Sequence, residues 1–305
     1  MRIQAFMAAV AVVPSLASAA TPLQLAPATP WVLDYATNSC RLIRHFGQGK
    51  DATVFALESE APGALDMLVA GKPTVSSMYQ VPAKFLPLQT KPMLGFPARS
   101  TDNGDPLVLW SWVTLLPDDA AAAEAKRLQD RVAHPEIRPP AVSLAEQAAK
   151  KAQRQAFATN TTAIEIDGRV GRPVILETGP LGEPIKAFDQ CSRNSLRDWG
   201  VDPDLEDKIV RPVWAPKPWA WFNSSDYPKD MILRYEESVV KVRLLVDATG
   251  RVTKCTSISH FKEPAFNKIT CDKFTERAHF EPAELADGTK VPSYYVNKIV
   301  FRLER

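Results

Sequence analysis

The sequence predicts an α+β protein, with a mainly antiparallel β amino-terminal domain that also holds helices and a small β-β-α-β carboxy-terminal domain. Three observations support this fold class. Residues 31–114 contain short apolar runs separated by turn signals, a pattern typical of antiparallel strands. A stretch rich in Ala, Glu, Lys, Arg and Gln follows over 118–157 and predicts helices. The last eighty or so residues then order their patterns as strand, strand, helix, strand.

Strands are predicted in the amino-terminal domain, residues 31–200, where apolar residues alternate or run together between turn signals. They are expected at 53–57, 65–70, 107–116, 164–170 and 174–178. The many prolines before residue 98 should mark loops or sheet edges, because proline cannot donate a backbone hydrogen bond within a sheet.

Two helices are predicted between 118 and 157, because a proline-rich stretch at 135–140 separates them. Ser143 and Glu146 form a capping box that begins the second helix, and its mostly alanine apolar positions predict that it lies on the surface. A third helix is expected over 183–199, where apolar residues recur on one face and Gly200 stops the pattern.

Residues 201–221 are predicted to be a proline- and tryptophan-rich linker between the amino-terminal domain and the carboxy-terminal domain, residues 222–305. Trp214, Trp219 and Trp221 either pack against a domain or form an exposed contact site. Packing is favoured, because large aromatic side chains contribute strongly when they are buried.

The first twenty residues predict an export signal. Arg2 supplies a positive charge, residues 5–13 form a short apolar run, and Ala17-Ser18-Ala19 is a typical cleavage site. Pro14 interrupts the apolar run well short of the roughly 20 residues that a membrane-spanning helix needs, so cleavage after residue 19 or 20 is favoured over an uncleaved anchor.

The charge composition argues against a nucleic-acid partner. The chain has 37 basic and 35 acidic side chains, which leave a net charge of +2. Without an excess of basic residues, no stripe is expected that could neutralise a phosphate backbone.

The four cysteines, Cys40, Cys191, Cys255 and Cys271, are an even number in a chain with an export signal, which favours disulfides over zinc ligation. Of the three connectivities, Cys40 with Cys191 and Cys255 with Cys271 is preferred, because each bridge then stays within one domain. Cys255 has the opposite strand parity to Val252, so the second bridge requires a bulge or a twist.

Four short motifs in the carboxy-terminal region occur in a characteristic order. They are Tyr227-Pro228, the hairpin turn 247–250, Phe280-Glu281-Pro282-Ala283 and Asp287-Gly288. With the predicted order of strands and helix, they make residues 226–305 resemble the carboxy-terminal domain of the TonB family, and the whole chain resembles the TonB-like energy transducer proteins of Gram-negative bacteria.

The resemblance implies a mode of binding and a partner. In the family, an extended periplasmic segment of an outer-membrane receptor adds to an exposed sheet edge. The corresponding edge here is the last strand, with the candidate residues Ser293, Tyr295, Asn297, Ile299 and Phe301. The nearby cations Lys290, Lys298 and Arg302 equally fit charges that protect an edge from aggregation.

The chain also departs from the energy-transducing members of this family. They have an amino-terminal membrane helix and a long proline-rich spacer, and neither is expected here. Ser238 stands where a glycine commonly begins the first strand. These departures weaken the expectation of energy transduction.

Catalytic motifs are weak. Ser259 and Lys262 match S-x-x-K, but the S-D-N and K-T-G motifs that accompany it in penicillin-recognising enzymes do not occur. The four histidines are scattered without spaced metal partners. We therefore predict no catalytic residue, no metal site and no small-molecule cofactor.

The sequence thus predicts a periplasmic protein-interaction protein with an envelope partner. One alternative is an exported enzyme whose site lies in the amino-terminal domain. The other is a TonB-type energy transducer anchored in the inner membrane by an uncleaved signal.

Overall fold

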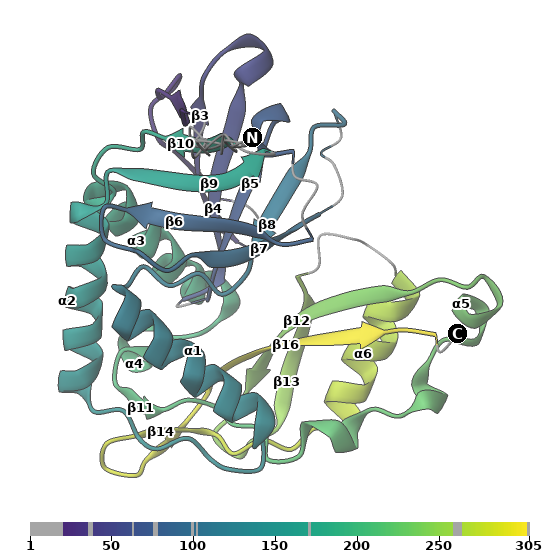
Figure 1. Ribbon diagram of the computed structural model, residues 1–305. Coiled ribbons are helices and arrows are strands. Elements are labelled where there is room, and N and C mark those ends of the chain that lie inside the picture. The colour runs from purple at the N-terminus through teal and green to yellow at the C-terminus, as the bar shows by residue number, and fades with distance from the viewer. Residues whose placement is uncertain are drawn as a thin grey trace, which may run out of the picture.

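The computed structural model describes residues 21–35, 39–62, 64–75, 79–98, 101, 103–169, 172–258 and 264–303. The predicted export signal, residues 1–20, lies outside these ranges. The chain combines helices with largely antiparallel sheets, which confirms the α+β class (Figure 1).

A ten-stranded sheet forms the amino-terminal body, in the order β1-β10-β9-β6-β7-β8-β5-β4-β3-β2. Within the described residues its neighbours are antiparallel, except that β1 runs parallel to β10. The strands are β1 Leu23–Leu25, β2 Val32–Tyr35, β3 Cys40–Phe46, β4 Thr53–Ala61, β5 Ala64–Ala70, β6 Val81–Leu86, β7 Met93–Pro97, β8 Leu107–Trp110, β9 Ala163–Arg169 and β10 Arg172–Leu176. In Figure 1, β6, β7, β9 and β10 run across the direction of β3, β4 and β5.

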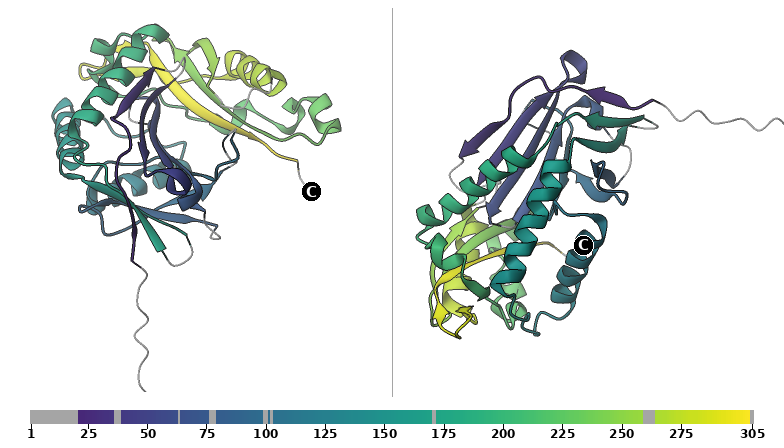
Figure 2. Two further views of the ribbon diagram at one scale, coloured as in Figure 1. Left: turned by 90° about the horizontal axis from the view of Figure 1, so that it is seen from above. Right: turned by 90° about the vertical axis from the view of Figure 1, so that its left-hand side faces the viewer.

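The helices of the body are α1 Asp118–Ala133, α2 Leu144–Asn160 and α3 Gly182–Trp199. Helix α3 buries the apolar face predicted for it and ends at Gly200, whose φ of 92° is the left-handed conformation that glycine adopts readily. Helix α1 buries no residue and α2 buries only Phe157 and Ala158, which confirms the predicted surface position of α2. Figure 2 shows α2 and α3 lying over the strands.

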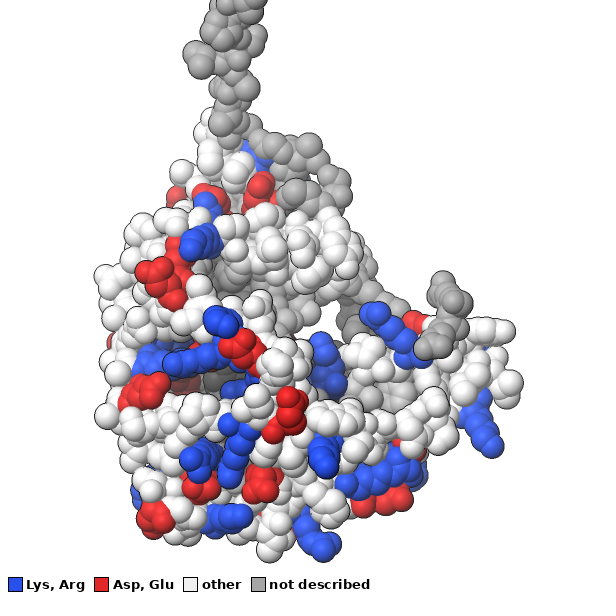
Figure 3. All heavy atoms as spheres, turned by 60° about the horizontal axis from the view of Figure 1, so that its bottom comes forward, with Lys and Arg blue, Asp and Glu red and all other residues white. Residues whose placement is uncertain are grey.

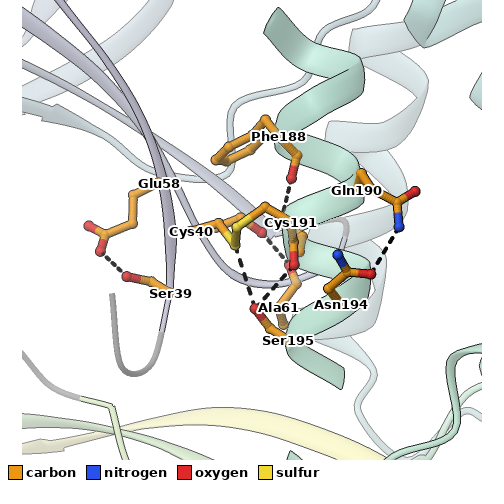
Figure 4. The surroundings of a disulfide bond; sticks show 11 residues. Ser39, Cys40, Glu58, Ala61, Phe188, Gln190, Cys191, Asn194 and Ser195 are labelled. Atoms are coloured by element: carbon orange, nitrogen blue, oxygen red, sulfur yellow. Dashed lines mark hydrogen bonds between the residues drawn. A yellow bond between two sulfur atoms is a disulfide. The ribbon is translucent and has the colours of Figure 1, made fainter. Parts of the chain in front are cut away.

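A disulfide joins β3 to α3, as predicted. Cys40 and Cys191 have Cα atoms 6.1 Å apart and both are buried in the core of the body. Figure 4 shows the bridge beside Phe188, with the Ser195 hydroxyl within 3.5 Å of the Cys40 Sγ. The helix is therefore bound to the inner face of the sheet both by packing and by a covalent bond.

The carboxy-terminal module has a second sheet, in the order β13-β12-β16, with helix α6 on one face. Its elements are α5 Lys229–Leu233, β12 Ser238–Val246, β13 Val252–Ser257, α6 Pro264–Arg277, β14 Ala283–Leu285, β15 Lys290–Val291 and β16 Ser293–Phe301. The predicted order of strand, strand, helix, strand is present, with the short strands β14 and β15 inserted before the last one. Phe266 and Phe274 of α6 are fully buried against this sheet.

The second disulfide, Cys255 with Cys271, joins β13 to α6 with a Cα separation of 5.5 Å. The register explains how Cys255 reaches the helix. Val246 pairs with Val252 and Leu245 with Lys254, so no residue of β12 lies opposite Thr253 in the register. This bulge places Val252 and Cys255 on the same face of the strand, as the sequence required.

The segment predicted to be a linker, 201–221, carries regular structure: α4 Pro203–Glu206, β11 Ile209–Arg211 and the 3-10 turn Pro218–Trp221. Strand β11 pairs with β14 of the carboxy-terminal module, and the apolar side chain of Ile209 is buried in the module's core. Trp221 packs against Phe280, and Trp214 donates its indole N–H to the Pro135 carbonyl, whereas Trp219 is 56% exposed.

Candidate interaction edge

Strand β16 forms one edge of the carboxy-terminal sheet. It pairs with β12 along its whole length, from Ser293 opposite Val246 to Phe301 opposite Ser238. In the part of the chain that the structure describes, no strand pairs with its other side. Alternate backbone N–H and C=O groups of such a strand point away from its neighbour, so the edge can accept a further strand.

The five predicted site residues share one face of β16. They lie opposite Ser238, Val240, Val242, Leu244 and Val246 of β12, on the side that α6 covers. Phe301 is buried with its ring centroid 4.8 Å from that of Phe266, and Tyr295 lies 4.9 Å from Phe280. Their aromatic side chains therefore hold the strand to the module, and the edge offers its backbone.

The opposite face of β16 has a covered half and an open half. Tyr294 and Val296 pack against Trp199 and its apolar neighbours in the body. Farther along, Lys298 is exposed and Val300 is 47% exposed, as is Val239 opposite it. We call Lys298 and Val300, together with Val239 opposite Val300, the open half of this face.

An exposed apolar group lies at the same end of the module. Ile232, Leu233 and Tyr235 are 42%, 81% and 85% exposed, in and just after α5. Figure 1 places α5 near the end of β16, and β12 begins three residues after Tyr235. This group was not predicted, although the sequence carries a signal for it in the apolar run 231–233, which follows Tyr227-Pro228 after two polar residues.

A charged junction lies between the body and the module. Lys241 of β12 pairs with Glu60 of β4 and lies 3.7 Å from a carboxylate oxygen of Asp66. The Arg243 guanidinium lies 3.5 Å from the ring centroid of Trp199, and burial lowers the pKa of Arg243 to about 10. Burial also raises the pKa of Glu60 although Lys241 opposes this. The outer face of the module is thus fixed to the body by ion pairs and a cation–π contact.

A partly buried carboxyl group supports the start of β16. The Ser293 hydroxyl donates to Glu206 Oε2 at 2.7 Å, and burial is the main cause that raises the pKa of Glu206. Segment 201–221 and β16 are therefore linked by a side-chain hydrogen bond as well as by the apolar contacts around Trp199.

The described residues hold no group of three or more potential metal ligands and no helix long and apolar enough to cross a membrane. The S-x-x-K match begins at Ser259 and ends at Lys262, both outside the described residues. On the face drawn in Figure 3, basic and acidic side chains are mixed.

Residues 223–303 match the family model of the Gram-negative bacterial TonB protein C-terminal. The match covers the module from the turn before α5 to the end of β16, and it confirms the predicted resemblance. Domains of this family act in interaction and energy transduction at the cell envelope. No curated protein matches the chain.

Proposed function

With residues 223–303 forming a TonB-type carboxy-terminal domain, we propose that this domain binds an extended segment of another envelope protein, which adds as a strand along β16. The unpaired side of β16 is the observation that carries the proposal. The proposed partner is the periplasmic segment of an outer-membrane receptor.

Two features support recognition along this edge. Backbone hydrogen bonds supply affinity in strand addition, and side chains that alternate along the bound segment supply selectivity. In the open half, Val300 and Val239 form an apolar surface beside Lys298. A segment with an apolar residue near Val300 and an acidic residue near Lys298 fits this arrangement.

Site-specific photocrosslinking in Gram-negative cells tests the proposal. A photoreactive side chain at Lys298 is expected to capture an outer-membrane receptor, identified by mass spectrometry. The matched control is Thr253, which is also exposed but lies on β13 at the other edge of the sheet. Equal capture from both positions, or none from Lys298, would contradict strand addition at β16.

The proposed location is the periplasm, after removal of the signal. The motivating observation is the charged, apolar and small-residue pattern of residues 1–20. Measuring the mass of the mature amino terminus tests it: loss of 19 or 20 residues is expected. An intact amino terminus would favour the membrane-anchored energy transducer.

The division of the chain into domains 31–200 and 222–305 is also proposed. Separate apolar cores in the body and the module support it. The pairing of β11 with β14 attaches residues 209–211 to the module, so limited proteolysis is expected to cut before β11.

A further inference from the structure

Arg44 occupies an unusual position for a cation. It lies on β3 between Leu42 and Phe46, both of which face the core of the body, so its side chain starts on the inner face of the sheet. Among the described residues, no carboxylate lies within ion-pair distance of it. A partly desolvated cation without a counter-ion is costly, and such groups concentrate at functional sites.

The guanidinium is nevertheless held in place. Its Nε donates to the Thr29 carbonyl and its Nη1 to the Thr178 carbonyl, each at 2.8 Å. It also lies 5.2 Å from the ring centroid of Trp31 and 5.8 Å from that of Phe46. Since a guanidinium has five N–H groups, these two bonds leave three for a ligand.

The group lines a shallow, open pocket of about 630 Å³ on the surface of the body. Trp31, Pro27, Pro180 and Pro184 supply apolar walls, and Glu177 is the acidic residue among the lining. Glu177 is exposed and forms no ion pair with Arg44. Burial lowers the pKa of Arg44 without changing its charge near neutral pH.

We propose that this pocket binds a carboxylate carried on an apolar or aromatic group, with the carboxylate on Arg44 and the apolar part against Trp31 and the prolines. An arginine fork suits the two oxygens of a carboxylate. The carboxylate belongs either to a small free acid or to the carboxy terminus of a peptide. The site lies in the body and is independent of the proposed binding at β16.

Isothermal titration of the mature full-length protein tests this with three probes: phenylacetate, acetyl-Ala-Ala-Phe with a free carboxylate, and the same peptide as its carboxamide. Binding of phenylacetate is expected if a small acid suffices, and binding of the free-carboxylate peptide alone would identify a peptide terminus. In both cases the carboxamide should bind at least about tenfold more weakly, because it lacks the charge that the arginine pairs with.

Variants of the pocket residues test whether carboxylate binding takes place at this site. Arg44→Gln is expected to weaken carboxylate binding by about tenfold or more, and Arg44→Lys by less, because lysine keeps the charge but loses the fork. Glu177→Gln should strengthen it about twofold by removing a repelling charge. Circular dichroism checks that each variant is folded. The proposal is overturned if the wild type binds neither carboxylate at millimolar concentration, if the carboxamide binds equally well, or if folded Arg44→Gln or Glu177→Gln binds as the wild type does.

Discussion

At the scale of single residues, the charged side chains of β12 show how position determines role. Lys241 and Arg243 alternate with the buried Val240, Val242 and Leu244, so the sequence places them on the face away from α6. The alternation alone does not determine whether that face is exposed to solvent or packed against protein. The structure places Glu60 and Trp199 there, and both cations become part of a junction.

Glu206 provides a prediction at this scale. Its pKa is raised in the folded protein, mainly by burial, so the folded state holds the proton more tightly than the unfolded chain does. Burying the ionised carboxylate lowers the stability of the folded state. This cost is absent below the ordinary pKa of glutamate, where the group is protonated in both states, and it is fully present above the raised folded-state pKa. Glu206→Gln is therefore expected to raise Tm at pH 8 and to change it little at pH 4, as measured by scanning calorimetry.

Glu183→Gln is a matched control, because the Glu183 side chain is 87% exposed. It should leave Tm nearly unchanged at both pH values. A larger gain for Glu206→Gln at pH 4 than at pH 8 would contradict the direction of its pKa shift.

At the scale of elements, the spacing of Val252 and Cys255 conflicts with a regular strand. They are an odd number of positions apart along β13, so in a regular strand only one of them could face α6. The bulge at Thr253 absorbs one residue and lets Cys255 lie opposite Leu244. The sequence showed the conflict in parity, whereas the choice between a bulge and a twist depended on pairing with β12.

Two variants test whether the number of residues in β13 controls the position of Cys255. Deleting Thr253 restores regular alternation and keeps Cys255 opposite Leu244, so the disulfide with Cys271 should still form. Inserting one alanine between Lys254 and Cys255 moves the thiol to the opposite face. Quantifying free thiols in the unfolded, unreduced proteins should give none for the deletion and about two for the insertion.

Two free thiols in the deletion variant would show that Thr253 itself, and not the residue count, positions the bridge. The Cys40–Cys191 bridge serves as an internal control, because it lies in the body and neither change touches it.

At the scale of the whole molecule, the two disulfides should contribute unequally to stability. Cys40 and Cys191 are separated by 151 positions, and Cys255 and Cys271 by 16. In the chain-entropy model, replacing the first pair by alanine should cost about 5 kcal/mol and replacing the second about 3 kcal/mol. Urea unfolding of the two double variants measures both, and a larger cost for the second pair would contradict that model here.

The contact between body and module gives a second prediction at this scale. Trp199 is 7% exposed and contacts both Tyr294 and Arg243 of the module. Trp199→Ala should lower the free energy of unfolding by about 3 kcal/mol, because it leaves a cavity in this contact. Trp219→Ala is the control, since Trp219 is 56% exposed and its loss should cost less than about 0.5 kcal/mol.

Equal costs for the two variants would mean that Trp199 does not couple the body to the module. A mutant that unfolds in two separate steps would support the coupling, because the body and the module have separate apolar cores.

The sequence by itself determined the α+β class, the positions of helices α2 and α3 and the order of elements in the TonB-type domain. These depend on local periodicity, capping residues and spacing along the chain, which act before distant segments meet. The sequence also favoured the cysteine pairing that the structure has, because each bridge then stays within one domain. The choice of the last strand as the edge also followed from the family resemblance.

Only the tertiary structure decided how the body covers the outer face of the module, why the segment 201–221 is ordered, and that Arg44 lies in a pocket. Each depends on contacts between residues far apart in the chain, such as Lys241 with Glu60, Ile209 with Leu285 and Arg44 with Thr178. A local pattern records which face of an element a residue occupies, but the neighbour that meets that face is set by packing of the whole molecule.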